Sequence, residues 1–161
     1  ARLGSAQMKE AVASSRYSIP DLVSDLKRVV AETADEREIL RRVRPLAKRA
    51  ALARDSWLDK RHYTADPKQG FGLHLLHEEP DHTLAVFAVS WLPNRGAPAH
   101  DHGTWAVVVG VDGPEKNVFF ERMDDRKRPG YAELRKTGEK IFNLGDVLAM
   151  PTGGRHSILN E

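Results

Sequence analysis

Three histidines have the residue type and spacing of a metal site: His100, His102 and His156. His100 and His102 flank Asp101, and residues two apart on a strand point to the same face of a sheet. Two imidazoles on one face can therefore bind one metal ion. Pairs with this spacing also occur by chance on surface strands, so the neighbouring residues decide whether these histidines are ligands.

The residues around the pair favour an inward-facing position. Gly96 and Pro98 precede His100, and the apolar run from Trp105 to Val111 follows the pair. Such a run is typical of a strand that enters the core rather than of a polar edge. We therefore expect both imidazoles to point toward the interior.

His156 belongs to a second motif with a regular pattern of turn residues. Gly145 and Gly153 permit tight turns that larger residues resist, and Pro151 fixes the approach to the second turn. Together with His156 and Asn160, these residues match the second sequence motif of the cupin superfamily. The chain thus resembles the cupins, which implies a mainly β fold, the cupin double-stranded β-helix (a jelly-roll barrel).

The first motif departs from the usual cupin pattern at one position. Most metal-binding cupins carry a glutamate about four residues after the second histidine, where this chain has Ala106 and Val107. Three neutral imidazoles leave a bound ion its full charge. Imidazole suits Fe, Zn, Cu and Ni, so the ligand type alone does not identify the metal.

The stretch from Pro98 to Trp105, paired with His156 and lacking the glutamate, resembles the thiol dioxygenases, the relatives of cysteine dioxygenase and 3-mercaptopropionate dioxygenase. The resemblance covers about residues 53–161. It implies that His100, His102 and His156 hold Fe(II), although Zn, Ni or another divalent metal could occupy the same ligands. It also implies a non-haem iron-dependent dioxygenase that oxidises a small thiol, cysteine or 3-mercaptopropionate-like, to a sulfinate with O2.

Three departures from that family limit what the resemblance implies. His74 stands where cysteine dioxygenases have a carboxylate-binding arginine, Val107 stands where the mammalian type has a crosslinked cysteine, and the family's Ser-His-Tyr relay would follow Glu161. His74 is a candidate substrate-pocket residue, with a hydrogen-bonded wall residue as the alternative. Trp105 is a second candidate, for which packing in the barrel wall is the favoured alternative. No catalytic residue is assigned.

Two other functions fit the same motifs. One is a metal-binding cupin with another reaction, such as ring cleavage by dioxygen or isomerisation, and the other is a non-catalytic cupin that binds a small ligand. Metal content and thiol-dependent oxygen uptake distinguish them from a thiol dioxygenase.

Composition narrows the class of protein. The 161 residues are 40% apolar and 30% charged with a net charge of +2, which indicates one globular domain and gives little support for a nucleic-acid partner. The absence of cysteine excludes disulfides and thiolate ligands and is compatible with a cytoplasmic protein. No apolar run is long enough for a membrane span. We expect small-molecule partners only, apart from a possible homodimer.

Hydrophobic periodicity predicts helices first and strands afterwards. Apolar stripes predict one helix starting at Ser18, a second starting with a capping box at Thr33 and Glu36, and a short helical piece over 53–60. The predicted domains are a loose arm over 1–17, a helical segment over 18–62 and a cupin barrel over 63–161 that lacks its last strand or strands. Strands are expected over 71–77, 83–92, 104–111, 117–123, 131–136, 140–143, 147–150 and 156–159.

Overall fold

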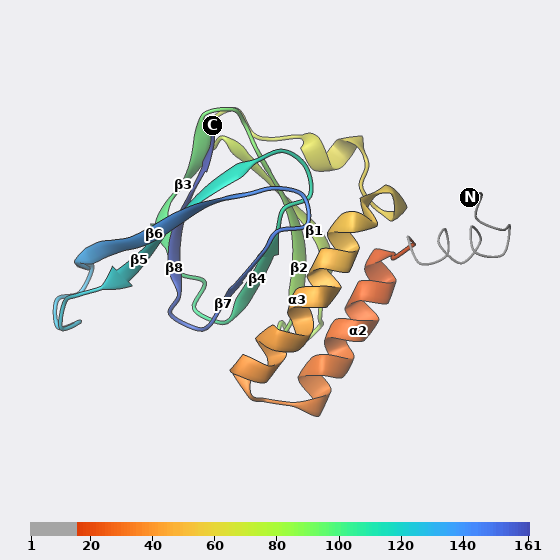
Figure 1. Cartoon of the computed structure of the whole chain (residues 1–161), viewed down its shortest axis with the longest axis horizontal. Helices are drawn as coiled ribbons and strands as arrows, with labels where there is room; N and C mark the ends of the chain where they lie inside the picture. Colours follow the sequence, from red (N-terminus) through yellow and green to blue (C-terminus); the bar gives the residue numbers. More distant parts are fainter. Residues whose placement is uncertain (1–15) are drawn as a thin grey trace, which may run out of the picture.

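The computed structural model describes residues 16–161, in which two helices precede a set of antiparallel strands (Figure 1). Helix α2 (Ile19–Glu32) begins as expected, because Ser18 caps it and exchanges side-chain and backbone hydrogen bonds with Asp21. Of the arm expected over 1–17 only the last two residues are described, and Tyr17 is already buried in the core.

Helix α3 (Glu36–Leu52) starts at a different residue from the one we expected. Asp35 is its N-cap and accepts a hydrogen bond from the Arg37 backbone N–H, whereas the Thr33 hydroxyl accepts one from the Asp35 N–H instead. The helical piece expected after α3 divides into two short 3-10 helices, η1 (Arg54–Ser56) and η2 (Lys60–Tyr63). No helix in the described residues is long and apolar enough to cross a membrane.

The β part consists of antiparallel strands in three hydrogen-bonded sheets. The first sheet pairs β1 with β2, the second has the order β3-β8-β5-β6, and the third pairs β4 with β7. The strand bounds are β1 Phe71–Glu78, β2 Ala85–Trp91, β3 Arg95–His100, β4 Ala106–Val109, β5 Glu115–Arg122, β6 Leu134–Phe142, β7 Val147–Met150 and β8 Arg155–Asn160.

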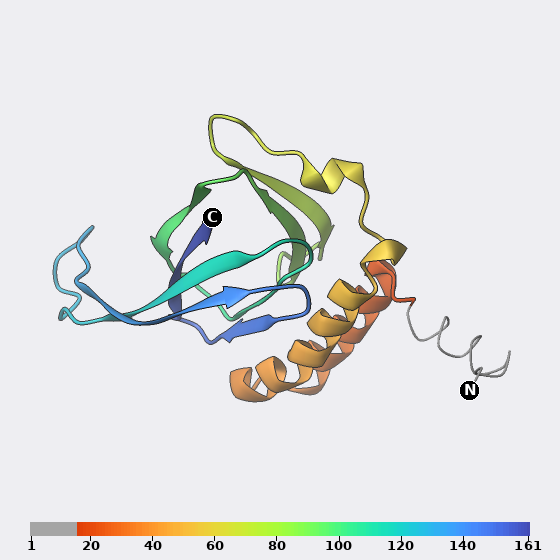
Figure 2. The same ribbon diagram turned by 45° about the horizontal axis from the view of Figure 1, so that its top comes forward.

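The mainly β class is confirmed, but the expected closed barrel is wrong for residues 16–161. The strands surround a common interior (Figure 2), yet no ladder joins the three sheets into one ring. β1 and β2 pair only with each other, as do β4 and β7. The outer edges of these two sheets therefore have no partner strand within residues 16–161. The arrangement is compatible with a β-sandwich. β8 lies inside its sheet, between β3 and β5.

Two strands differ from the sequence-based expectation for local reasons. No strand was expected over β3, which contains Gly96 and Pro98, and its register with β8 shifts around that proline. β6 was predicted as two strands because Thr137 and Gly138 interrupt its pattern. The structure instead accommodates the interruption as a register shift opposite Phe119 within one long strand.

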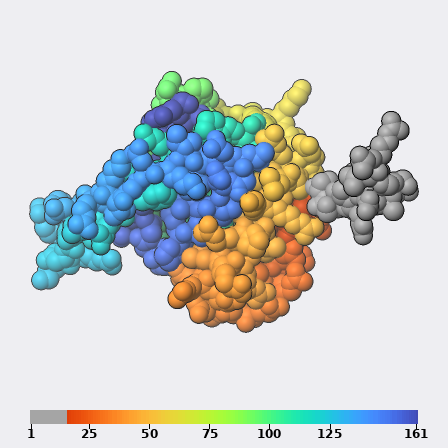
Figure 3. All heavy atoms as spheres, in the orientation of Figure 1, coloured from red at the N-terminus to blue at the C-terminus, as the bar shows by residue number. Residues whose placement is uncertain are grey.

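The helices cover one side of the strands, and the hydrophobic core lies between them (Figures 1 and 3). Trp105 and Val107, next to and within β4, pack against buried residues of α2 and α3. This packing fixes β4, and with it the segment that directly follows the histidine pair. The β5–β6 hairpin extends away from the helices (Figure 3). The buried core residues are Tyr17, Leu22, Leu26, Val29, Ile39, Val43, Ala50, Ala53 and Leu84.

Replacing Gly96 with alanine is expected to lower the free energy of unfolding by about 2 kcal/mol or more. A Cβ at this position would lie 1.8 Å from the carbonyl oxygen of Ile158, so β3 and β8 could not keep their spacing. Thermal or urea unfolding measures the effect. Gly138→Ala is the matched control, because a Cβ there meets nothing within 4 Å and the loss should stay below about 1 kcal/mol. Equal losses in the two variants would contradict the close approach.

Candidate metal centre

The pairing of β3 with β8 brings two of the histidines together across 56 residues of sequence. His100, the last residue of β3, is the antiparallel partner of His156, the second residue of β8. Their ring centroids are 4.6 Å apart. His102 lies beyond the end of β3, so the expectation that both members of the pair sit on one strand is wrong. The chain turns after His100 and brings His102 back to the same point.

A short turn holds the loop that carries His102. The Asp101 carboxylate accepts a hydrogen bond from the Gly103 backbone N–H at 3.1 Å, and Gly103 has a φ of +68°. Glycine adopts this left-handed conformation without the steric cost that other residues meet. The turn therefore directs the His102 ring toward the other two histidines rather than along the line of β3.

The three side chains converge closely enough to bind one ion. Their donor nitrogens all lie within 4.8 Å of one another, and no carboxylate in the described residues belongs to the group. His102 Nε2 and His156 Nε2 are 3.2 Å apart. Two nitrogens bound to one ion at about 2.1 Å stand roughly 3.0–3.4 Å apart for octahedral to tetrahedral angles, so this pair has the spacing of cis ligands.

A buried hydrogen-bond chain orients His156. His156 Nδ1 lies 2.7 Å from Asn117 Oδ1, and Asn117 Nδ2 donates to Glu115 Oε1 at 3.0 Å. Because the carboxylate only accepts, the amide must present its oxygen to the imidazole, and Nδ1 must carry the proton. Nε2 is then left with its lone pair, as a metal ligand requires. His156 and Asn117 are 0% and 1% exposed, so this orientation is isolated from water.

His100 is oriented by the backbone in a similar way. Its Nδ1 lies 2.8 Å from the carbonyl oxygen of Pro98, which can only accept a hydrogen bond. The proton therefore sits on Nδ1, and Nε2 is free to bind a metal. Sequence analysis did not identify Glu115 and Asn117. A polar residue at an inward position beside the apolar run Val118–Phe120 was the signal that could have revealed Asn117.

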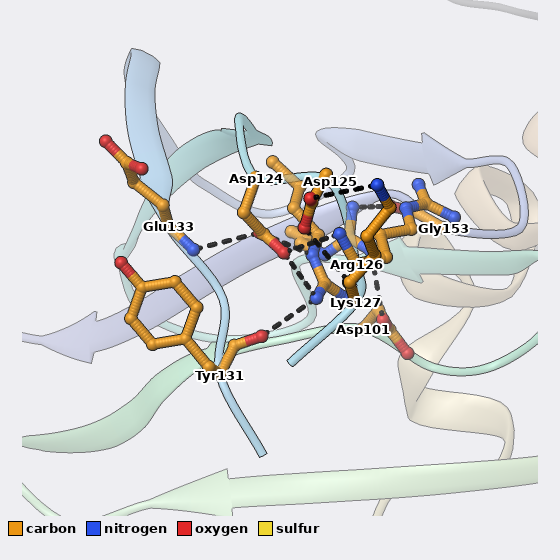
Figure 4. Close-up of polar contacts among 10 residues, drawn as sticks. Asp101, Asp124, Asp125, Arg126, Lys127, Tyr131, Glu133 and Gly153 are labelled. Carbon is orange, nitrogen blue, oxygen red and sulfur yellow. Dashed lines mark hydrogen bonds and ion pairs between the residues drawn. The ribbon is translucent and has the colours of Figure 1, made fainter. Parts of the chain in front are cut away.

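Arg155 contacts Asp101 of the loop that carries His102, within a cluster of charged side chains (Figure 4). Arg155 Nη2 lies 3.6 Å from Asp101 Oδ2, and Arg155 Nη1 donates to the Gly153 carbonyl at 2.9 Å. Its side chain is only 15% exposed, so Arg155 lies largely inside the molecule. Nearby, Arg122 pairs with Asp124 through two hydrogen bonds of 2.7 and 2.9 Å. The Arg155–Asp101 contact connects the His102 loop to the start of β8.

The site favours neutral imidazoles. Burial, followed by the nearby His100 and His102 side chains, lowers the pKa of His156 to about 4. Burial, with a further contribution from His100, also lowers the pKa of His102. A neutral imidazole is the form that binds metal, so protons compete weakly for these nitrogens near pH 7.

The three histidines border a cavity of about 430 Å³ with mainly apolar and aromatic walls. The walls come from η2, β1, β2, β4 and β8 and the segments between them. His74 borders a different cavity, where its Nε2 lies 3.0 Å from the Thr64 carbonyl oxygen. Trp105 packs against the helices and does not line the histidine cavity. The structure therefore brings together the three predicted ligands, but it places neither candidate pocket residue beside them.

No protein-family model matches the sequence, and no curated protein matches it either. The geometry of the site is thus the main basis for assigning a function.

Replacing His102 with alanine is expected to weaken binding of Zn(II) or Co(II) by about 100-fold or more, because one of three ligands is lost. Calorimetric titration of the metal-free protein measures the affinity, with one ion per chain expected for the unchanged protein. His102 lies on an exposed loop, so its loss should not unfold the chain. His82→Ala removes an exposed histidine outside the site and should bind metal normally. Equal affinities for the two variants would exclude the histidine triad as the ligand set.

Replacing Asn117 with alanine is expected to lower metal affinity about 10- to 100-fold, because His156 loses the acceptor that fixes its proton on Nδ1. Asn160→Ala is the matched control. It removes an amide hydrogen bond to the Trp91 carbonyl but touches no ligand. Metal affinity that is unchanged in Asn117→Ala, or equally reduced in both variants, would argue against the orienting role.

Proposed function

We propose that this chain is a thiol dioxygenase that holds ferrous iron with His100, His102 and His156 and oxidises a small thiol to a sulfinate. The observation that carries the proposal is a donor set of three imidazoles, with no carboxylate, beside a mainly apolar cavity. The cupin resemblance of the motifs around these histidines agrees with it. The cupin fold is part of the same proposal.

The ligand set matches the chemistry of a thiolate substrate. Neutral donors leave the ion a net charge of +2, and a thiolate brings its own negative charge to it. Iron bound here would supply the electron transfer between sulfur and dioxygen that neither the substrate nor the side chains provide. A site that already contained a carboxylate would attract a second anion less strongly.

The residues of the chain then have separate roles. Asn117 keeps the His156 proton on Nδ1, and the Pro98 carbonyl does the same for His100, so both rings are held with Nε2 toward the site. The apolar walls make the surroundings of the substrate less polar than water. A less polar environment strengthens the attraction between the thiolate and the cationic centre.

The overall reaction balances without a further reductant. A thiol, R–SH, and O2 give the sulfinic acid R–SO2H: the O–O bond breaks and two S–O bonds form. Sulfur loses four electrons and dioxygen gains four. The thiol proton ends on the sulfinic acid or is released to water, where the product ionises.

A second function is favoured by the aromatic cavity walls. Ring cleavage of a small aromatic diol by dioxygen would use the same metal ligands, and Trp91 and Phe71 could stack on a ring. Thiol oxidation is preferred because it explains why no carboxylate within residues 16–161 joins the three histidines.

Iron-loaded protein is expected to consume O2 only when a small thiol is added, with one O2 used for each sulfinate formed. An oxygen electrode measures the uptake, and mass spectrometry with 18O2 should show two labelled oxygen atoms in the product. His102→Ala should reduce the rate at least 100-fold. Oxygen uptake with a catechol but with no thiol would support ring cleavage instead. If iron-loaded protein consumes no O2 with either a thiol or a catechol, the proposal of a dioxygenase fails.

A further inference from the structure

The charges around the histidine cavity all have one sign. Two carboxylate residues, Asp112 and Glu115, border it, and among the described residues no Lys or Arg lines it. The chain as a whole carries a net charge of +2, with 25 basic and 23 acidic residues. The cavity therefore differs in charge from the molecule that surrounds it.

Glu115 has no cation beside it. No ion pair reaches its carboxylate within residues 16–161, and its only side-chain partner there is the neutral amide of Asn117. The nearest basic neighbour in sequence, Lys116, pairs with Glu161 instead. A partly buried carboxylate with one neutral donor keeps most of its negative potential, and the apolar walls screen that potential less than water does.

Asp112 adds a second acidic group beside η2. Its carboxylate accepts a hydrogen bond from the Tyr63 hydroxyl at 2.7 Å and lies 3.4 Å from Arg54 Nη1. Arg54 offsets part of this charge, but it lies outside the cavity lining and its Nη1 also donates to the Val111 carbonyl at 2.7 Å. Both partners of the guanidinium, Val111 and Asp112, line the cavity, so Arg54 lies directly behind this part of the wall and Glu115 carries the uncompensated charge.

Aromatic faces complement the carboxylates. Trp57, Tyr63, Phe71 and Trp91 all border the cavity, and the rings of Phe71 and Trp91 stand 5.5 Å apart at a tilt of 47°. Aromatic faces attract cations through their quadrupole, whereas they offer no comparable attraction to the carboxylate group of a bound small molecule. Acidic groups, aromatic walls and the lack of basic lining all favour the same kind of ligand.

We infer that the cavity selects a thiol that carries a cationic amine and no carboxylate, with its sulfur toward the three histidines and its ammonium toward Glu115. The substrate class is therefore an aminothiol, of which cysteamine is the simplest. This inference rests on the proposed function for the identity of the reactive group. The charge selectivity of the cavity does not depend on any reaction.

Binding is tested without oxygen chemistry by loading the protein with Co(II) and titrating thiols under nitrogen. The absorption band of a cobalt-thiolate bond reports occupancy. Three thiols of similar size provide the comparison: cysteamine is cationic, 2-mercaptoethanol is neutral and 3-mercaptopropionate is anionic. The expected dissociation constants rise in that order, with at least a tenfold difference between the cationic and anionic thiols.

Glu115→Gln is the decisive variant, because glutamine can still accept the hydrogen bond from Asn117 while the charge is removed. It should reduce the preference for cysteamine over 3-mercaptopropionate at least threefold. Glu133→Gln removes the same charge on the β5–β6 hairpin and should leave the preference unchanged (Figure 4). A preference for 3-mercaptopropionate, or equal effects of the two variants, would overturn the inference.

Oxygen uptake by the iron-loaded protein separates the two proposals. If Co(II)-loaded protein prefers cysteamine but iron-loaded protein oxidises no thiol, charge selection by the cavity is retained and the dioxygenase is excluded. If oxygen is consumed fastest with 3-mercaptopropionate, the dioxygenase stands and the aminothiol substrate is excluded.

Discussion

The antiparallel pairing of β3 with β8 is the constraint on which the site depends. It places His100 opposite His156. A shift of the strand register by one residue would turn either imidazole to the opposite face of the sheet. Gly96 allows the two strands to approach, since the Ile158 carbonyl occupies the space of a side chain there. β5 then pairs with the other side of β8 and brings Asn117 behind His156. Two of the three candidate ligands, and the asparagine that supports His156, therefore arise from one sheet, whereas His102 comes from the loop after β3.

Burying this polar chain has a cost that the protein offsets locally. An imidazole or amide that is buried in an apolar interior without a hydrogen-bond partner lowers the stability of a protein by roughly 1–3 kcal/mol. Here no buried side-chain nitrogen or oxygen in the described residues lacks a partner. His156 donates to Asn117, and the partly exposed Glu115 accepts a hydrogen bond from the Asn117 amide nitrogen. The network ends at Glu115, which borders the cavity.

The three ligands could be predicted from sequence because their spacing and the flanking glycines and proline are local signals. The helix-then-strand order was also predictable, since the apolar periodicity changes from 3.6 to 2 near Phe71. Asn117 was not recognised, because its place beside the apolar run Val118–Phe120 indicates an inward-facing polar residue but not which side chain it contacts. The position of His74 required the actual register of β1 with β2, which turns its ring toward Thr64 and away from the triad. β3 was missed because Pro98 and Gly96 have low strand propensity.

His102 differs from the other two ligands in how it is held. His100 and His156 belong to strands, and each has its Nδ1 tied to an acceptor, whereas His102 is exposed and sits on a loop fixed by Asp101. Opening that loop separates one ligand from the ion without disturbing any strand pairing. Uptake and release of a metal ion held by these histidines would then need only a local movement of a few residues, so its exchange rate would be set independently of the unfolding rate of the protein.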